Sequence, residues 1–237
     1  MLEEVLKQEA KKIAKKYKIG ENEVLEKLKA EGENTKEGKK EFKKLLKKVK
    51  KNIYYELRTY KRKEGHISIL ERDPYLEKLL SNIDGELKSA KSIIDVGGGM
   101  FPITFPFEKY PNINKYVWID KDKTSYRKLK SKFGKMEKLV LFNHKVGEQP
   151  WSYYGENFDV ALLLKFVPVI SRQEKHLLKI VSEIPAKQIV ITGNKEALTK
   201  RADIKYREDK IIRNFIAKTG RKITKSFDIG NEFGYVI

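Results

Sequence analysis

The chain has 237 residues, of which 40% are hydrophobic and 11% aromatic, so it is long and apolar enough to bury a core. It contains no cysteine, which excludes disulfides, thiolate metal ligands and a cysteine nucleophile. Its 52 lysines and arginines against 33 acidic residues give a formal charge of +19, which predicts attraction to nucleic acid, acidic lipid or acidic protein. With no run of about 20 apolar residues and few histidines, we expect a soluble cytoplasmic protein with neither a membrane span nor a metal site.

The first 91 residues are rich in Lys and Glu and have helical periodicity. Apolar residues at three- and four-residue steps predict helices over 2–17, 21–30 and 42–57, the last with lysines on its other face. The pair Asp73-Pro74 predicts an N-cap followed by the first residue of another helix. We therefore predict a helical, basic domain over residues 1–91.

From residue 92 onward, short apolar runs alternate with helical stretches. The expected strands are 92–96, 115–120, 138–142, 158–164 and 187–192, and the expected helices are 123–133, 171–183 and 206–219. This alternation predicts a parallel sheet with helices on both faces. Two closing strands, 222–229 and 233–237, predict an antiparallel hairpin. The fold class is therefore α/β, and residues 92–237 have the arrangement of class I S-adenosylmethionine (SAM) methyltransferases.

The first expected strand runs into Asp95, Val96 and three consecutive glycines that include Gly97 and Gly99. Glycines at the carboxyl end of a strand let a ligand lie against bare backbone. The turn is not a P-loop, because no Gly-Lys-Ser/Thr follows, and its glycine spacing disfavours a dinucleotide.

Asp120 closes the next strand, where an acid can accept hydrogen bonds from both hydroxyls of a ribose. The alternative is that Asp120 is the N-cap of the following helix. Together with the glycine turn, Asp120 favours a nucleoside-containing cofactor.

The sequence resembles the aminoglycoside-resistance 16S ribosomal RNA methyltransferases that modify a guanine N7, as a divergent or archaeal-type relative. The similar segments, in order, are 66–72 (His-x-Ser-x-x-Glu-Arg), 94–106 (the glycine turn and its Pro-containing continuation), 162–168 (Leu-Leu-Leu-Lys-x-x-Pro), 198–201 (Leu-Gly-Gly-Arg in the family) and 231–237 (the last strand). The sequence departs from the family at Gly98, usually Cys, at Phe101, usually Asn, and at 191–194, which replaces a Ser-Phe-Pro segment.

The resemblance implies SAM as the cofactor and gives roles to individual residues. The implied cofactor contacts are Arg72, Asp95, Gly97, Gly99, Asp120, Asn143, His144, Leu164 and Gln173. Arg72 would hold the SAM carboxylate with its guanidinium, and Lys165 would lie where substrate and cofactor meet. The alternatives are a surface arginine, a polar loop at Asn143 and His144, and a solvated charge at Lys165.

Guanine N7 carries a free lone pair, so methylation there needs placement rather than a general base. The absence of an Asn-Pro-Pro-Tyr motif agrees with N7 chemistry, and the absence of Cys excludes cytosine-C5 chemistry. Phe105, Phe166 and Trp151 are candidates for stacking on a flipped base, although each fits a core position better.

Basic residues concentrate in two segments. Residues 36–63 contain thirteen Lys and Arg against three Glu, and residues 195–225 contain eleven against four acids. We expect RNA contacts from Lys43, Lys47, Lys50, Lys51 and Arg201.

The expected partner is ribosomal RNA in the small subunit, bound by a monomer, and the target would be in the decoding region. The alternatives are a SAM methyltransferase for transfer RNA, protein or a small molecule, and a non-catalytic RNA-binding relative of the fold. The charge distribution distinguishes an RNA substrate from a small molecule, and a SAM-binding titration distinguishes an enzyme from a non-catalytic relative.

Overall fold

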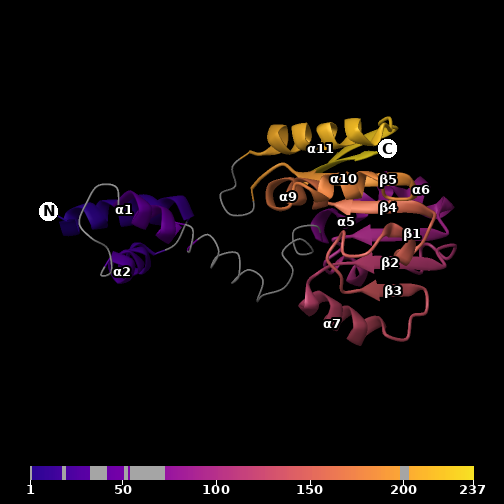
Figure 1. Ribbon diagram of the computed structural model, residues 1–237, viewed down its shortest axis with the longest axis horizontal. Coiled ribbons are helices and arrows are strands. Elements are labelled where there is room, and N and C mark those ends of the chain that lie inside the picture. The colour runs from indigo at the N-terminus through magenta and orange to yellow at the C-terminus, as the bar shows by residue number, and fades with distance from the viewer. Residues whose placement is uncertain (1, 18–19, 33–41, 51–52, 54–72, 198–202) are drawn as a thin grey trace. The chain divides into compact units, whose positions relative to one another are not determined.

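The computed structural model describes residues 2–17, 20–32, 42–50, 53, 73–197 and 203–237 (Figure 1). The protein divides into two compact units, and each is described by itself. The first comprises residues 1–67 with 197–202, and the second comprises 68–196 with 203–237.

The first unit is helical. It contains α1 (Leu2–Tyr17), α2 (Glu21–Gly32) and a helical stretch over 42–50. Their apolar faces share one core, formed by Ala10, Ile13, Ala14, Val24, Leu28, Leu45, Val49 and Ile53. The helices expected over the first two segments are therefore confirmed, and the third is confirmed over its described residues.

The second unit is built on one sheet. Its strands are β1 (Ser92–Val96), β2 (Lys115–Ile119), β3 (Leu139–Phe142), β4 (Phe158–Leu164), β5 (Ala186–Asn194), β6 (Lys225–Ile229) and β7 (Glu232–Val236). In the described part of the chain the order across the sheet is β3-β2-β1-β4-β5-β7-β6. The pairs among β1 to β5 are parallel, whereas β7 is antiparallel to both β5 and β6. The predicted fold class is confirmed.

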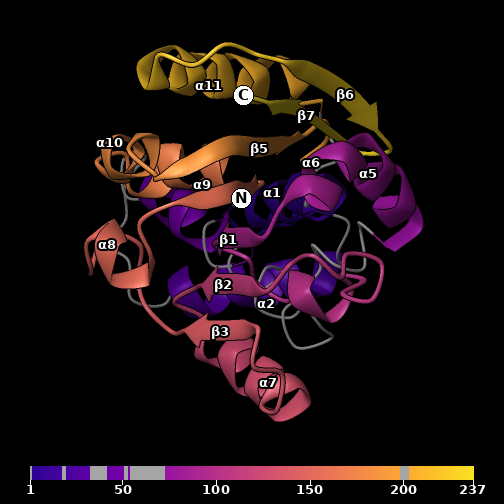
Figure 2. The same ribbon diagram turned by 90° about the vertical axis from the view of Figure 1, so that its right-hand side faces the viewer.

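Helices cover both faces of this sheet (Figure 2). They are α5 (Leu76–Asn82), α6 (Asp84–Ser89), α7 (Lys123–Phe133), α8 (Trp151–Tyr154), α9 (Phe166–Gln173), α10 (Leu177–Ser182) and α11 (Lys205–Thr219), with 3-10 turns at Asp73–Tyr75 and Phe101–Ile103. Successive strand residues point to opposite faces. Ile94 therefore packs in the core that includes residues of α9, α10 and α11, while its neighbour Ile93 packs in the core of α5 and α6. In the described segments, no helix has both the length and the apolar character needed to cross a membrane.

Two expectations about helices need correction. In place of the single helix expected over 171–183 there are two helices. The first, α9, begins at Phe166, directly after β4, and ends at Gln173, and the second is α10. Pro168 is compatible with this start, since proline is tolerated in the first turn of a helix. The Asp73-Pro74 pair starts a 3-10 turn that leads into α5, rather than an α-helix.

The helices α5 and α6 pack on the sheet although their sequence belongs to the segment predicted as N-terminal. Leu79, Ile83 and Leu87 are fully buried in the same core as Ile93. The boundary between compact units thus lies near residue 67. The functional boundary drawn at residue 91 stays a prediction.

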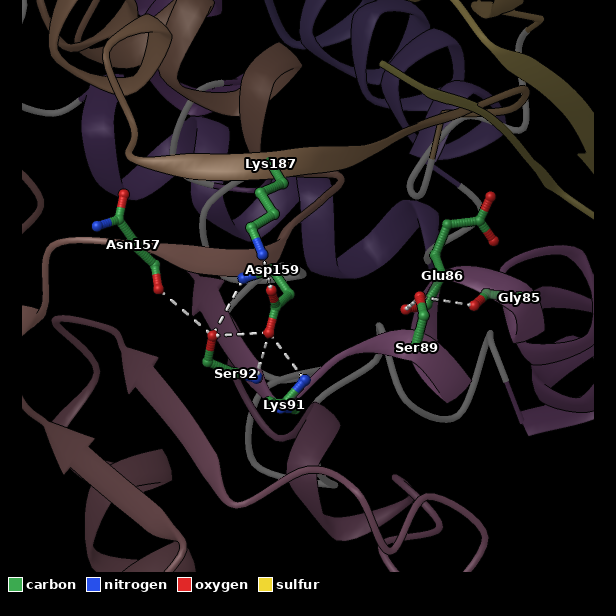
Figure 3. Close-up of polar contacts among 8 residues, drawn as sticks. All are labelled: Gly85, Glu86, Ser89, Lys91, Ser92, Asn157, Asp159 and Lys187. Carbon is green, nitrogen blue, oxygen red and sulfur yellow. Dashed lines mark hydrogen bonds and ion pairs between the residues drawn. The ribbon is translucent and has the colours of Figure 1, made fainter.

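The amino-terminal ends of β1, β4 and β5 are joined by Asp159 (Figure 3). Its Oδ2 accepts hydrogen bonds from the backbone N–H of Lys91 at 2.8 Å and of Ser92 at 3.0 Å, and its Oδ1 lies 2.7 Å from Lys187 Nζ. The Lys187 ammonium, together with these N–H groups, lowers the pKa of Asp159 to about 2, against the opposing effect of burial. Asp159 therefore holds together the amino-terminal ends of these three strands, at the end of the sheet opposite to the glycine turn.

We expect Asp159→Asn to lower the free energy of unfolding at neutral pH by roughly 1–2 kcal/mol, since the charged hydrogen bonds are weakened. A lowered pKa means that this contribution is present above about pH 4 and is lost as pH falls toward 2. Urea unfolding at about pH 7 and about pH 2.5 gives the measurement. Lys187→Gln, which removes only an exposed partner, is the control and should cost less than about 0.5 kcal/mol. An equal loss at both pH values in Asp159→Asn would contradict this role.

Candidate active site

The glycine turn after β1 has the backbone conformation that its sequence predicts. Gly97 and Gly99 have φ values of 67° and 52°, in the left-handed region that favours glycine. A Cβ on Gly97 would lie 2.3 Å from the Phe166 ring. A Cβ on Gly98 would lie 2.2 Å from Asp95 Oδ2 and 2.7 Å from Trp118 Cδ1. In this chain Trp118 and Asp95 thus occupy the space that the cysteine found at this position in the resembling family would need.

Asp120, at the end of β2, is bound to this turn. Its Oδ2 accepts the backbone N–H of Gly99 at 2.9 Å, and its Oδ1 accepts that of Asp122 at 2.9 Å. The Asn143 side chain, after β3, donates to the carbonyl of Asp120 at 2.9 Å. The structure therefore brings together the ends of β1, β2 and β3 through three of the predicted residues.

The alternative interpretation of Asp120 as a helix cap is wrong. The N-cap of α7 is Asp122, whose Oδ1 accepts the N–H of Thr124 at 3.1 Å and whose Oδ2 accepts the Ser125 hydroxyl at 2.7 Å. Asp120 is thus not used as the cap of α7. A carboxylate has about four lone-pair positions, and the two backbone N–H groups leave the others for further donors.

The other predicted residues occupy different environments. Asp95 is fully buried and accepts the Tyr116 hydroxyl at 2.9 Å, so it lies beneath the glycine turn. Leu164 is 9% exposed at the end of β4, whereas Gln173 is exposed at the end of α9. His144 Nδ1 lies 3.2 Å from the Tyr154 hydroxyl, and burial raises the pKa of Tyr154 to about 12.

Several predicted residues lie outside the described part of the chain. They are Arg72, Lys51 and Arg201. Lys43 and Lys47 are exposed on the 42–50 helix, and Lys50 Nζ lies 4.0 Å from Glu9.

Lys165 has an unusual backbone conformation at the junction of β4 and α9. Among the described residues it is the only non-glycine with a positive φ, 61°, a conformation that is uncommon and is retained where surrounding contacts enforce it. Its backbone N–H lies 3.2 Å from the carbonyl of Thr192 and 3.0 Å from the Thr192 hydroxyl. Its Nζ is 3.0 Å from Glu232 Oε1.

Glu232 and Thr192 complete this network and were not predicted from the sequence. The Thr192 hydroxyl donates to Glu232 Oε2 at 3.1 Å, joining β5 to β7. The side chains of Lys165 and Glu232 are only 12% and 5% exposed, so the pair is largely desolvated. The signal that could have indicated it was an acid at the start of an otherwise apolar strand, a position where burial requires a partner.

Glu174 forms a second unpredicted contact at this edge of the sheet. It lies 2.9 Å from Lys121 Nζ and 2.6 Å from Lys145 Nζ, connecting the loops after β2 and β3 to the end of α9. Lys145, followed by Lys121, lowers the pKa of Glu174 to about 2, so its charge persists at neutral pH. The described residues contain no group of three side chains that could hold a metal ion.

The candidate stacking residues pack against other parts of the protein. Phe105 is 4% exposed and contacts the rings of Phe107 and Tyr116 at centroid distances of 4.9 and 5.2 Å. Trp151 donates its indole N–H to the carbonyl of Ile180 at 2.9 Å. The core interpretation that the sequence favoured for these two aromatics agrees with these contacts.

The strand order, the glycine turn after β1 and the acid at the end of β2 define a class I methyltransferase fold. Among solved structures, the 16S rRNA methylase ArmA is 25% identical over 73% of this chain and 86% of its own, with a TM-score of 0.57. An rRNA methylase from Escherichia coli is 15% identical over 98% of both chains, with a TM-score of 0.54. The 16S rRNA methyltransferase RmtF, solved with S-adenosyl-L-homocysteine, is 13% identical over 98% of this chain and 96% of its own, with a TM-score of 0.57. No protein-family profile and no curated protein sequence matches the chain.

Proposed function

We propose that the protein is a SAM-dependent methyltransferase that modifies ribosomal RNA. The observation that carries this proposal is the hydrogen bond from the Gly99 N–H to Asp120, because it holds a carboxylate, which we propose to be the ribose acceptor, beside the glycine turn. The likeness to ArmA, an rRNA methylase by name, and the charge of +19 support RNA as the substrate.

The residues at the carboxyl edge of the sheet fit SAM. Asp120 retains acceptor positions for two ribose hydroxyls. Asn143 and His144 lie on the adjoining loop, where an adenine would lie. Gly97 and Gly99 carry no side chains of their own, so the methionine part would lie against their backbone, beside the Phe166 ring that packs on Gly97. Arg72 would bind its carboxylate in a bidentate pair.

Within the RNA, we propose guanine N7 in the small-subunit decoding region as the target. When bound, SAM supplies an electrophilic methyl group on a sulfonium. The N7 lone pair needs no deprotonation, so the chain's residues have to place the base in line and exclude water. This requirement is consistent with a site whose acids, Asp95 and Asp120, hold the strand ends and the turn rather than serving proton transfer.

Lys165 is the residue proposed to orient the base. A lysine ammonium is a suitable donor to guanine O6, which lies next to N7. Because methylation gives the base a positive charge, an ammonium without a counter-charge nearby would oppose the reaction. Glu232, 3.0 Å from Lys165 Nζ, offsets that charge.

We expect Glu232→Gln to reduce kcat by about 10- to 100-fold, equivalent to roughly 1.4–2.8 kcal/mol, with SAM affinity within about threefold of the unmodified protein. Asp228→Asn is the matched control. Asp228 lies on the neighbouring strand β6, and its carboxylate pairs with the exposed Lys205. Thermal unfolding of both variants separates a loss of fold from a loss of chemistry. A change confined to KM or to the melting temperature would show that Glu232 does not act through Lys165.

The proposed function is tested by incubating the protein with tritiated SAM and separated small and large ribosomal subunits. We expect label in the small-subunit RNA, at a site that is cleaved by aniline after borohydride reduction, the reaction of an N7-methylated guanine. A parallel incubation with transfer RNA covers the main alternative substrate. Label in transfer RNA or in the large subunit alone, or SAM binding without transfer to any RNA, would favour the alternative substrates or the non-catalytic relative.

A further inference from the structure

The solvent-facing surface of α7 and of the two residues that follow it carries cations and no carboxylate. Residues 123–135 contain six Lys and Arg and no Asp or Glu. All six are exposed: Lys123, Arg127, Lys128, Lys130, Lys132 and Lys135. The opposite side of the helix packs on the sheet unit through buried Leu129 and partly buried Tyr126 and Phe133. We call the six cations the α7 cationic surface.

These cations lack ion-pair partners among the residues that the structure describes. Lys130 and Lys132 lie over the rings of Tyr126 and Phe133, at 5.7 and 5.3 Å from the centroids. By contrast α11 mixes its cations with acids, and its Arg213 pairs with Asp209.

The like charges on α7 work against the helix. Lys123 and Arg127, and also Lys128 and Lys132, are four residues apart, a spacing at which like charges destabilise a helix. Acidic residues at some of these positions would give equal solubility and better helix stability. The arrangement therefore favours binding of an external polyanion.

The location of α7 indicates which polyanion it meets. The helix begins three residues after Asp120, at the carboxyl edge of β2. Both views place it beside β3, the outermost strand at this side of the sheet (Figures 1 and 2). A substrate that reaches Asp120 and Lys165 from this side would pass along the helix.

We propose that the α7 cationic surface binds the phosphate backbone of RNA, as a docking surface on the sheet unit in addition to the 42–50 helix. An acidic membrane is the less suitable partner, because α7 exposes no large apolar residue that could enter the lipid. The inference rests on the proposed function only in taking RNA as the polyanion.

The test compares two variants of equal charge. The first is Lys123→Gln with Arg127→Gln and Lys128→Gln, since glutamine keeps helix propensity while removing the charge. The control is Lys175→Gln with Lys179→Gln and Lys218→Gln, three exposed lysines outside α7. The affinity of the full chain for small ribosomal subunits and for a duplex RNA is measured over a series of salt concentrations. SAM binding is measured by calorimetry in parallel.

We expect the α7 variant to bind duplex RNA at least about 10-fold more weakly than the control. The slope of log affinity against log salt concentration is expected to be less steep by about 2–3, one for each phosphate that is no longer neutralised. SAM binding is expected to be unchanged in both variants. Equal weakening in the two variants, or a loss of binding to anionic phosphatidylserine vesicles but not to RNA, would overturn the proposal. If neither variant nor the unmodified chain bound SAM while the α7 effect on RNA persisted, the proposed function would fail and the docking surface would stand.

Discussion

Asp120→Ala is expected to weaken SAM binding by on the order of 100-fold, the equivalent of about 2.7 kcal/mol. The substitution removes the carboxylate proposed to accept two hydrogen bonds from the ribose hydroxyls, and hydrogen bonds to a charged group are worth about 1.5–3 kcal/mol each. It also releases the Gly99 N–H, which Asp120 holds at 2.9 Å, so the glycine turn loses a restraint. Calorimetric titration with S-adenosylhomocysteine gives the measurement.

The matched control for this change is Asp122→Ala. It removes a carboxylate two residues away that caps α7 through Thr124, so it should cost about 1 kcal/mol of stability. Its affinity for S-adenosylhomocysteine should stay within about threefold of the unmodified protein. If Asp120→Ala bound the ligand as well as Asp122→Ala does, Asp120 would have no part in the cofactor site.

The second large effect is expected from reversing charges on the 42–50 helix. Lys43→Glu with Lys47→Glu reverses two charges on one exposed stripe, since the two residues are four apart. RNA methylation is expected to fall by at least about 100-fold, because the proposed phosphate contacts would become repulsions, while SAM binding is unaffected. Lys50 is left intact, because it lies 4.0 Å from Glu9 and its reversal would disturb the helical unit itself.

Lys11→Glu with Lys15→Glu on α1 is the control for the docking helix. These lysines are also exposed and four residues apart in the same unit, so the total charge changes equally. Rates are measured with tritiated SAM and small subunits at two salt concentrations. Equal losses in the two double variants would mean that net charge alone, and not the 42–50 helix, governs RNA binding.

The strands could be predicted from the sequence because a buried parallel strand is a short continuous apolar run. The run Phe158–Leu164 forms β4 with the predicted bounds, and Ser92–Val96 forms β1. The start of α9 was not predicted, because its first residues continue the apolar run that forms β4. Phe166, Val167 and Pro168 extend an apolar run, and only the left-handed conformation of Lys165 ends the strand there.

The parts of the candidate site that depend on local sequence could be predicted, and those that depend on strand order could not. The glycine turn and Asp120 each follow a strand, so their place at the same edge follows from the parallel arrangement. Glu232 reaches Lys165 because β7 inserts between β5 and β6. No periodicity in the sequence reports that insertion, so a pair separated by 67 residues could not be inferred.

Glu174 shows the same limit. Its sequence neighbours, Gln173 and Lys175, give no indication of the loops after β2 and β3, yet it contacts lysines from both. Charge pairs between separate loops arise from tertiary packing, which single-sequence patterns do not encode.

The most direct test of the central claim is a crystal structure of the protein soaked with S-adenosylhomocysteine. We expect electron density for the ligand along the turn from Gly97 to Gly99, with both ribose hydroxyls within hydrogen-bonding distance of the Asp120 carboxylate. Density for the ligand elsewhere on the sheet, or a turn covered by protein side chains at saturating ligand, would contradict that claim.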